Sequence, residues 1–187
     1  MTPRDELKEI LRKKSIRTGD FTLASGKKSN FYVDCRVSTM DCRGAILVGE
    51  VGYEKIKETL LECDSTPTAI GGMTMGADPI SLAIAMESCR QDNGKDLQMF
   101  SVRKEAKKYG TGKRVEGNFQ SGNTVILVED TATTGGSTLK AMDAIEAEGG
   151  KIAFVLILVD REEGAREVIE ERGVSVVSIY GKEELLA

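Results

Sequence analysis

The stretch VILVEDTATTGGST, Val125 to Thr138, decides the fold and the chemistry of this 187-residue chain. Its first four residues are apolar and predict a buried strand, which ends in two adjacent carboxylates, Glu129 and Asp130. Burying either acid without a partner is energetically costly. We therefore expect the pair to hold a ligand at the end of the strand.

The segment after the acids combines small hydroxyl side chains with two glycines and leads into a helix predicted for residues 137–148. Backbone N–H groups and the positive end of that helix would converge on one point, which predicts a phosphate site. A phosphate beside two carboxylate acceptors suits ribose 5-phosphate, whose vicinal hydroxyls donate hydrogen bonds. The residues predicted to bind it are Glu129, Asp130, Thr131, Ala132, Thr133, Thr134, Gly135, Gly136 and Ser137.

The common nucleotide-binding motifs do not fit this segment. The pattern G-x-x-x-x-G-K-[ST] is absent from the chain, and no G-x-G-x-x-G follows the first strand. An alternative interpretation is an ordinary turn in which a Ser or Thr caps the helix and the acids favour its positive end. Two consecutive acids after a buried strand favour the ligand site over this alternative.

The rest of the chain alternates between apolar strands and helices. Strands are predicted at residues 68–72, 97–102, 124–129, 152–159 and 174–180, and helices at 43–61, 79–91, 137–148 and 163–172. This order predicts an α/β fold with a mostly parallel five-stranded sheet and helices on both faces. Ligands of such sheets bind beyond the carboxyl ends of the strands, where the acids and glycines lie.

The first 40 residues, here called the hood, follow a different pattern. Pro3 opens an amphipathic helix that ends near Lys14, and two β-rich runs at 21–24 and 31–34 flank a segment of turn-forming residues. They predict a helix followed by a small antiparallel hairpin. A length of 187 residues matches one compact domain of about 100 to 200 residues, so we expect a single domain over residues 1–187.

The composition excludes several classes of protein. The 26 Lys and Arg against 30 Asp and Glu give a net charge of −4, which argues against a nucleic-acid binder. Histidine is absent, so Ser-His and Cys-His catalytic pairs and His metal ligands are excluded. The longest apolar run, residues 152–159, is far shorter than the ~20 residues that span a membrane. With a charged N-terminus and four scattered cysteines, expected to be reduced thiols, these features predict a cytoplasmic protein that contacts no membrane.

A cationic segment, SVRKEAKKYGTGKRVEGN, covers residues 101–118 and is here called the basic loop. Its glycines interrupt any helix, and a polar loop of this length in a compact domain is typical of a functional lid. Closing such a loop brings positive charge to an anionic leaving group and expels water. The alternative is a solvated charged loop without a role. The cations of the loop are Arg103, Lys104, Lys107, Lys108, Lys113 and Arg114.

Two smaller features lie at the same predicted edge of the sheet. Arg161 follows the most apolar strand, where its planar guanidinium suits a substrate carboxylate; a surface salt bridge with Glu162 or Glu163 is the alternative. Residues 71–79 join a strand to a helix through three glycines, which permits close approach of the backbone to a phosphate. A plain tight turn with Pro79 at the start of the helix is the alternative there.

Taken together, these segments resemble a known family. VILVEDTATTGGST is similar to the phosphoribosyl-pyrophosphate signature of the type I phosphoribosyltransferases. Three more segments, FTLASGKKSNFYVD, VRKEAKKYGTGKRVEG and LVDREEGA, resemble those of the orotate phosphoribosyltransferases. The similarity extends over roughly residues 16–181 in order and implies the type I phosphoribosyltransferase fold.

The resemblance implies a reaction as well as a fold. Ribose 5-phosphate would pass from phosphoribosyl pyrophosphate (PRPP) to orotate, giving orotidine 5′-monophosphate and pyrophosphate in pyrimidine biosynthesis. Magnesium would be the cofactor, held mainly by pyrophosphate rather than by protein side chains. The family also implies a homodimer in which each basic loop covers the partner's site.

Matching positions imply the roles of individual residues. The two acids hold the ribose hydroxyls, while Thr134 and Arg161 contact orotate, whose carboxylate Arg161 reads. Cations of the basic loop contact pyrophosphate from the neighbouring subunit, and Tyr109 is a further expected substrate contact. The residues expected to be catalytic are Lys107, Arg103, Lys104 and Asp130.

The sequence departs from the family pattern at three positions. Tyr109 stands where many members carry a histidine, and Ala24 and Met75 stand where many members carry lysines near pyrophosphate. These departures leave the reaction type intact and affect the expected pyrophosphate contacts. Two rival functions stay open: a phosphoribosyltransferase for another nucleobase, against which Arg161 argues, and a non-catalytic sensor of PRPP, against which the basic loop argues.

Overall fold

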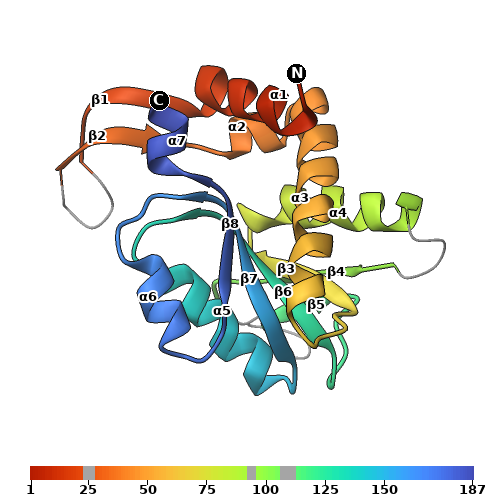
Figure 1. Ribbon diagram of the computed structural model, residues 1–187. Helices are drawn as coiled ribbons and strands as arrows, with labels where there is room; N and C mark the ends of the chain where they lie inside the picture. The colour runs from red at the N-terminus through yellow and green to blue at the C-terminus, as the bar shows by residue number, and fades with distance from the viewer. Residues whose placement is uncertain (23–27, 92–95, 106–112) are drawn as a thin grey trace.

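The computed structural model describes residues 1–22, 28–91, 96–105 and 113–187, in which the hood lies over one end of an α/β sheet (Figure 1). The elements in chain order are α1 (Pro3–Ile10), the π-helical turn η1 (Leu11–Ser15), β1 (Ile16–Thr22), β2 (Lys28–Val33), α2 (Arg36–Thr39), α3 (Cys42–Glu62), β3 (Ala69–Met73), α4 (Ala77–Gln91), β4 (Gln98–Val102), β5 (Val115–Gly117), β6 (Thr124–Ala132), α5 (Gly136–Ala147), β7 (Lys151–Asp160), α6 (Ala165–Glu170), β8 (Val176–Gly181) and α7 (Lys182–Leu186).

The main sheet has six strands in the order β5-β4-β3-β6-β7-β8. Its paired strands are parallel except for β5, which runs antiparallel to β4. The predicted mostly parallel sheet is confirmed, and the predicted count of five strands is too small by one. β5 lies within the segment expected as the basic loop, because a three-residue strand that ends in glycine carries no apolar alternation.

Two apolar cores cover the two faces of the sheet, as the alternation of side chains along a strand requires. Along β6, Ile126 and Val128 join the core that contains α3 and α4, whereas Val125 and Leu127 join the core that contains α5 and α6. Figure 1 shows these helix pairs on opposite sides of the sheet. Because both faces are covered, β6 is buried continuously from Val125 up to the first acid.

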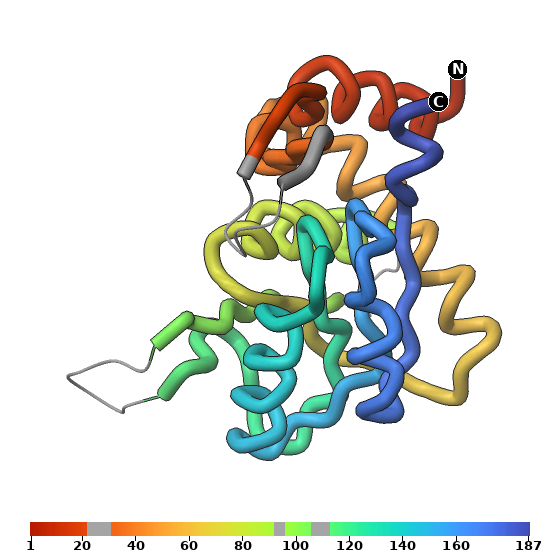
Figure 2. The backbone as a smooth tube through the Cα atoms, turned by 90° about the vertical axis from the view of Figure 1, so that its left-hand side faces the viewer, coloured from red at the N-terminus to blue at the C-terminus, as the bar shows by residue number. Residues whose placement is uncertain are grey.

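The hood consists of α1, η1, the β1–β2 hairpin and α2, and the C-terminal helix α7 packs beside it. The predicted hairpin is confirmed, but β1 begins at Ile16 rather than at residue 21, because pairing with β2 extends it through polar residues. The short helices α2 and α7 were not predicted. Figure 2 shows both chain termini at the hood end of the molecule.

Helix α3, with 21 residues, is the longest described helix and forms a wall beside the sheet. Asp41 caps it by accepting a hydrogen bond from the N–H of Gly44 at 3.0 Å. Its buried positions include Leu47, Val51 and Ile56, which belong to the core that also contains residues of α4. Within the described part of the chain, no helix combines the length and the apolar character needed to cross a membrane.

Close packing of β3 against its neighbours generates a stability prediction. A Cβ at Gly72 would collide with the carbonyl oxygen of Val128 and with the side chain of Ala77. We expect Gly72→Ala to lower the free energy of unfolding by about 1–3 kcal/mol, measured by urea denaturation. Gly136→Ala is the control, since a Cβ there meets open space. Equal stability of the two variants would contradict this packing.

Candidate active site

A cavity of about 520 Å³ lies between the hood and the carboxyl ends of the central strands. Three segments form its wall: hood residues 32–36, the β3–α4 loop at residues 73–76, and the end of β6 at residues 129–131. Lys104 and Ser137 complete the lining. The cavity therefore lies where the sequence places the ligand of a parallel sheet.

Glu129 is the more deeply buried of the two acids, with 6% of its surface exposed. Its Oε2 accepts hydrogen bonds from Ser137 Oγ at 2.8 Å and from Thr138 Oγ1 at 2.7 Å. Burial, reinforced by the neighbouring Asp130 carboxylate, raises the pKa of Glu129 to about 7 against the opposing effect of these hydroxyl donors. Burial also raises the pKa of Asp130. Two buried acids with raised pKa values favour a ligand that brings hydroxyl donors or a cation.

Asp130 lies directly against the β3–α4 loop. A Cβ at Gly76 would collide with the Asp130 carboxyl group, so glycine is required for this approach. In the same loop, Thr74 Oγ1 donates to Asp78 Oδ2 at 2.6 Å, and Ser101 Oγ from β4 donates to Asp78 Oδ1 at 2.7 Å. The group that approaches this loop in the structure is an acid of the site, and the predicted approach of residues 71–79 to a phosphate stays a prediction.

The turn between β6 and α5 has the geometry of an anion site. Gly135 occupies the N-cap position with a left-handed φ of 77°, and no side chain of the described residues caps α5. The alternative of a Ser or Thr cap is therefore wrong, and N–H groups of the first helical turn are available to a ligand. The Ser137 hydroxyl, expected at the phosphate, donates to Glu129 instead.

The other residues predicted in this turn take different positions. Ala132 is buried at the end of β6, and its carbonyl oxygen accepts a hydrogen bond from the N–H of Arg161 at 3.0 Å. Thr133 is half-buried, whereas Thr134 and Gly136 are exposed. Thr131 lines the cavity together with the acids.

Both described ends of the basic loop are fixed to the sheet edge. The N–H of Arg103 donates to the carbonyl of Arg114 at 2.8 Å, and the Arg103 guanidinium pairs with Glu116 at 3.5 Å. Lys104 lines the cavity. Lys107, Lys108 and Tyr109, like Ala24 in the hood, lie outside the described residues, so their predicted roles stay predictions.

Arg161 is 4% exposed and lies beneath the hood, outside the set of residues that line the cavity. Its Nε and Nη2 donate to Glu163 Oε1 at 3.1 and 2.9 Å, and Nη2 also donates to the carbonyl of Phe31 at 3.2 Å. The guanidinium lies 5.6 Å from the centre of the Phe31 ring. The salt bridge with Glu163 that the sequence allowed is present, but it is formed by a buried arginine rather than on the surface.

Four hood residues at the site were missed by the sequence analysis. Tyr32, at the end of β2, and Asp34, just beyond the strand, line the cavity. Arg36 also lines it, and its Nε and Nη2 each lie 2.9 Å from an oxygen of Asp34. Cys35 is buried, with its Sγ 3.4 Å from the carbonyl oxygen of Asp130 and 3.2 Å from Thr131 Oγ1. A single apolar thiol gives no sequence signal for such a contact.

Comparison with known proteins decides the family. No family model matches the chain. The orotate phosphoribosyltransferase of Aquifex aeolicus is 41% identical over 189 residues, which cover 100% of this chain and 99% of that protein. The chain belongs to the orotate phosphoribosyltransferase family.

Solved structures agree with this membership. The Mycobacterium tuberculosis orotate phosphoribosyltransferase in complex with Fe(III) dicitrate has a TM-score of 0.81 at 37% identity, covering 98% of this chain and 99% of that one. The same protein in complex with PRPP has a TM-score of 0.78 at 34% identity, covering 100% of both chains. The resemblance and the type I phosphoribosyltransferase fold expected from the sequence are confirmed.

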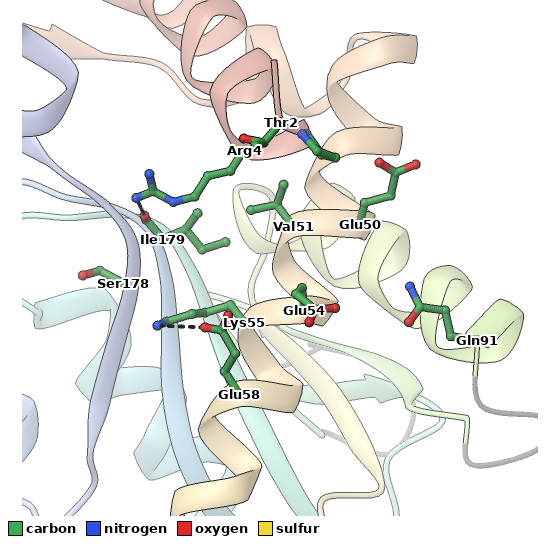
Figure 3. A pocket seen from close by; sticks show the side chains of 11 residues that line it. Thr2, Arg4, Glu50, Val51, Glu54, Lys55, Glu58, Gln91, Ser178 and Ile179 are labelled. Atoms are coloured by element: carbon green, nitrogen blue, oxygen red, sulfur yellow. Dashed lines mark hydrogen bonds and ion pairs between the residues drawn. The ribbon is translucent and has the colours of Figure 1, made fainter.

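A second cavity, of about 450 Å³, lies away from the family's signature segment, between α1, α3 and β8 (Figure 3). Its charged groups are largely paired with neighbours: Lys55 lies 3.4 Å from Glu58, and Arg4 Nη2 donates to the carbonyl of Ile179 at 2.7 Å. The signature acids and the uncapped helix end both lie at the other cavity, which we take as the site.

The buried acid makes stability depend on pH. The pKa of Glu129 rises from an ordinary value of 4.5 to about 7 on folding, so the folded chain binds more protons than the unfolded chain between these values. Stability from this group is therefore lost as the pH rises through that window. We expect the free energy of unfolding of the native chain, relative to Glu129→Gln, to fall by up to about 3 kcal/mol between pH 5 and pH 8.

Urea denaturation of both proteins across this pH range measures the effect. Glu171→Gln, which removes an exposed carboxylate, is the control and should follow the native chain. A difference between native chain and Glu129→Gln that stays constant with pH would contradict the raised pKa.

Proposed function

We propose that this chain transfers ribose 5-phosphate from PRPP to orotate, giving orotidine 5′-monophosphate and pyrophosphate. One observation carries the proposal: a buried acid pair and an uncapped helix N-terminus adjoin one cavity in a chain of the orotate phosphoribosyltransferase family. The acids accept the ribose hydroxyls, and the N–H groups of the turn and of α5 bind the 5′-phosphate.

The charges around the cavity suit this reaction. Cleavage of the bond between C1 of ribose and pyrophosphate leaves positive charge on the sugar and negative charge on the leaving group. Glu129 and Asp130 stabilise the first, and the cations of the basic loop, Lys104 and Lys107 among them, stabilise the second. Orotate attacks C1 through a ring nitrogen, and the proton of that nitrogen passes to an oxygen of the departing pyrophosphate, so a chain without histidine needs no imidazole base.

Magnesium fits the residues of this site as a partner of pyrophosphate. Among the described residues, no group of three or more His, Cys, Asp and Glu side chains is arranged to hold a metal ion. Glu129 and Asp130 still offer carboxylate oxygens, which magnesium accepts alongside phosphate oxygens. When bound, the ion neutralises charge on the departing pyrophosphate.

Arg161 favours orotate over a nucleobase without a carboxylate, because its guanidinium at the end of β7 is a bidentate partner for that group. The exposed Thr134 on the neighbouring turn is the second proposed orotate contact. A PRPP sensor without catalysis would need no cationic loop at the cavity, yet Lys104 lines the wall. We place the reaction in the cytoplasm, and the four free cysteines support that assignment.

We also propose a homodimer that uses an apolar face next to the site. Large side chains about half exposed line a groove of about 260 Å³ between α3 and α4, and two more lie in and directly after the neighbouring α2. Such a patch on one face is typical of a protein interface. Met75 is exposed in the β3–α4 loop and lines the active-site cavity. The exposed members of the face are Val37, Met40, Ile46, Leu82 and Met86.

Base selectivity tests the proposed reaction. Purified protein with magnesium and PRPP should consume orotate and leave uracil and hypoxanthine unreacted. The consumption of orotate is measured as the loss of its absorbance. The reason is that only orotate carries the carboxylate that Arg161 binds. Turnover of hypoxanthine without orotate would overturn the substrate assignment, and no turnover of any base would favour the sensor.

Mixing two inactive variants tests whether the basic loop acts across the dimer. Lys107→Ala removes a loop cation, and Asp130→Asn removes a ribose acceptor, so each variant alone should lose most of its turnover. If loops cross, a hybrid dimer carries both defects in one site and none in the other. We expect co-refolded mixtures to recover up to about a quarter of native activity per subunit, the share of intact sites at random mixing. Absence of recovery in a mixture shown by mass spectrometry to contain hybrids would place the loop over its own subunit.

A further inference from the structure

The contact between Arg161 and Glu163 has a geometry that goes beyond a surface ion pair. One oxygen of Glu163 accepts from both Nε and Nη2 of Arg161, at 3.1 and 2.9 Å. The Arg161 side chain is 5% exposed and that of Glu163 28%. A guanidinium buried to this degree has lost most of its hydration, so the carboxylate is a major source of its stability.

Glu163 fixes the plane of the guanidinium as well as its charge. The group is planar and rigid, so a partner on its Nε–Nη2 edge sets the direction of the remaining N–H bonds. The Phe31 carbonyl, 3.2 Å from Nη2, and the ring of Phe31 hold the group from the hood side. Arg161 is thus held between β2 of the hood and the segment that follows β7.

The backbone of this segment directs two adjacent acids to different places. Glu162 has a left-handed φ of 58°, and its N–H donates to Asp160 Oδ1 at 2.9 Å. Its carboxyl group lies against Gly181, where a Cβ would approach the Oε1 atom to 2.6 Å. Glu163 instead turns back to Arg161. The two glutamates are therefore a matched pair, of which one contacts the arginine and the other does not share that contact.

We propose that Glu163 is a positioning residue that orients Arg161 toward the carboxylate of the incoming base. This inference rests on the proposed function, in which Arg161 reads the carboxylate of orotate. Glu163 touches the arginine and acts on the substrate only through it. Its removal affects the base substrate and leaves PRPP, which binds at the acids and the α5 turn, unaffected.

Steady-state kinetics with both substrates varied tests the proposal. Glu163→Ala should raise KM for orotate about tenfold or more, as expected for loss of hydrogen bonds to a charged group, and leave KM for PRPP within about twofold. Glu163→Gln keeps an oxygen acceptor and should recover part of the loss. Glu162→Gln is the control and should match the native protein in both constants. Thermal midpoints of all variants, measured with and without PRPP, show that each folds and binds the donor.

A double-mutant cycle tests the positioning role of Glu163 separately from the proposed role of Arg161 in binding orotate. If Glu163 acts through Arg161, Glu163→Ala should add nothing to the effect of Arg161→Ala on KM for orotate. If Arg161→Ala itself leaves KM for orotate unchanged, the proposed role of Arg161 fails. Two outcomes overturn only the positioning role. In the first, Arg161→Ala raises KM for orotate and Glu163→Ala leaves it unchanged. In the second, Glu163→Ala lowers KM for orotate, because the carboxylate of Glu163 competes with orotate for Arg161.

Discussion

The energetic cost of a buried carboxylate governs the functional end of this molecule. Glu129 continues a strand that is buried on both faces, so its carboxylate is largely removed from the water that would stabilise its charge. Two hydroxyls from the first turn of α5 compensate in part, and they fix the helix start against the strand end. The same constraint leaves the acid poorly stabilised without a ligand. A polyhydroxy substrate supplies further hydrogen-bond donors to the carboxylate, and a cation supplies positive charge beside it.

The hood completes the site because side chains of the sheet edge depend on it. The thiol of Cys35 contacts the backbone and hydroxyl that flank the acid pair, and the Phe31 carbonyl accepts from Arg161. The residues proposed to bind the sugar and the residue proposed to bind the base therefore each contact the hood. The proposed sugar site and the proposed base site therefore both lie against the hood, which comes from the first 40 residues.

The sequence predicted the parts of the fold that rest on long apolar patterns. The strands around residues 126 and 156 follow from continuous apolar runs of strand length, and the helix between them follows from the glycine turns that bound it. β5 and α2 were not predicted, because pairing with β4 forms β5, and packing against η1 and α3 forms α2, rather than local preference. At the site, adjacent acids before a glycine turn were readable. The contact of Cys35 with Asp130 joins residues 95 apart in the chain, and no local pattern encodes it.

The two ends of the chain are clasped together in the hood. Arg4 pairs with Glu184, and the phenol of Tyr180 donates to the carbonyl of Arg4 at 2.6 Å. During synthesis the first helix leaves the ribosome long before residues 179–184 exist. Its apolar side chains Leu7 and Leu11 belong to a core that also contains Leu185, so their burial is complete only after residue 185 has been added to the chain. Arg4 and Glu184 are 180 residues apart, and contacts of such high sequence separation form slowly because a long loop must close first.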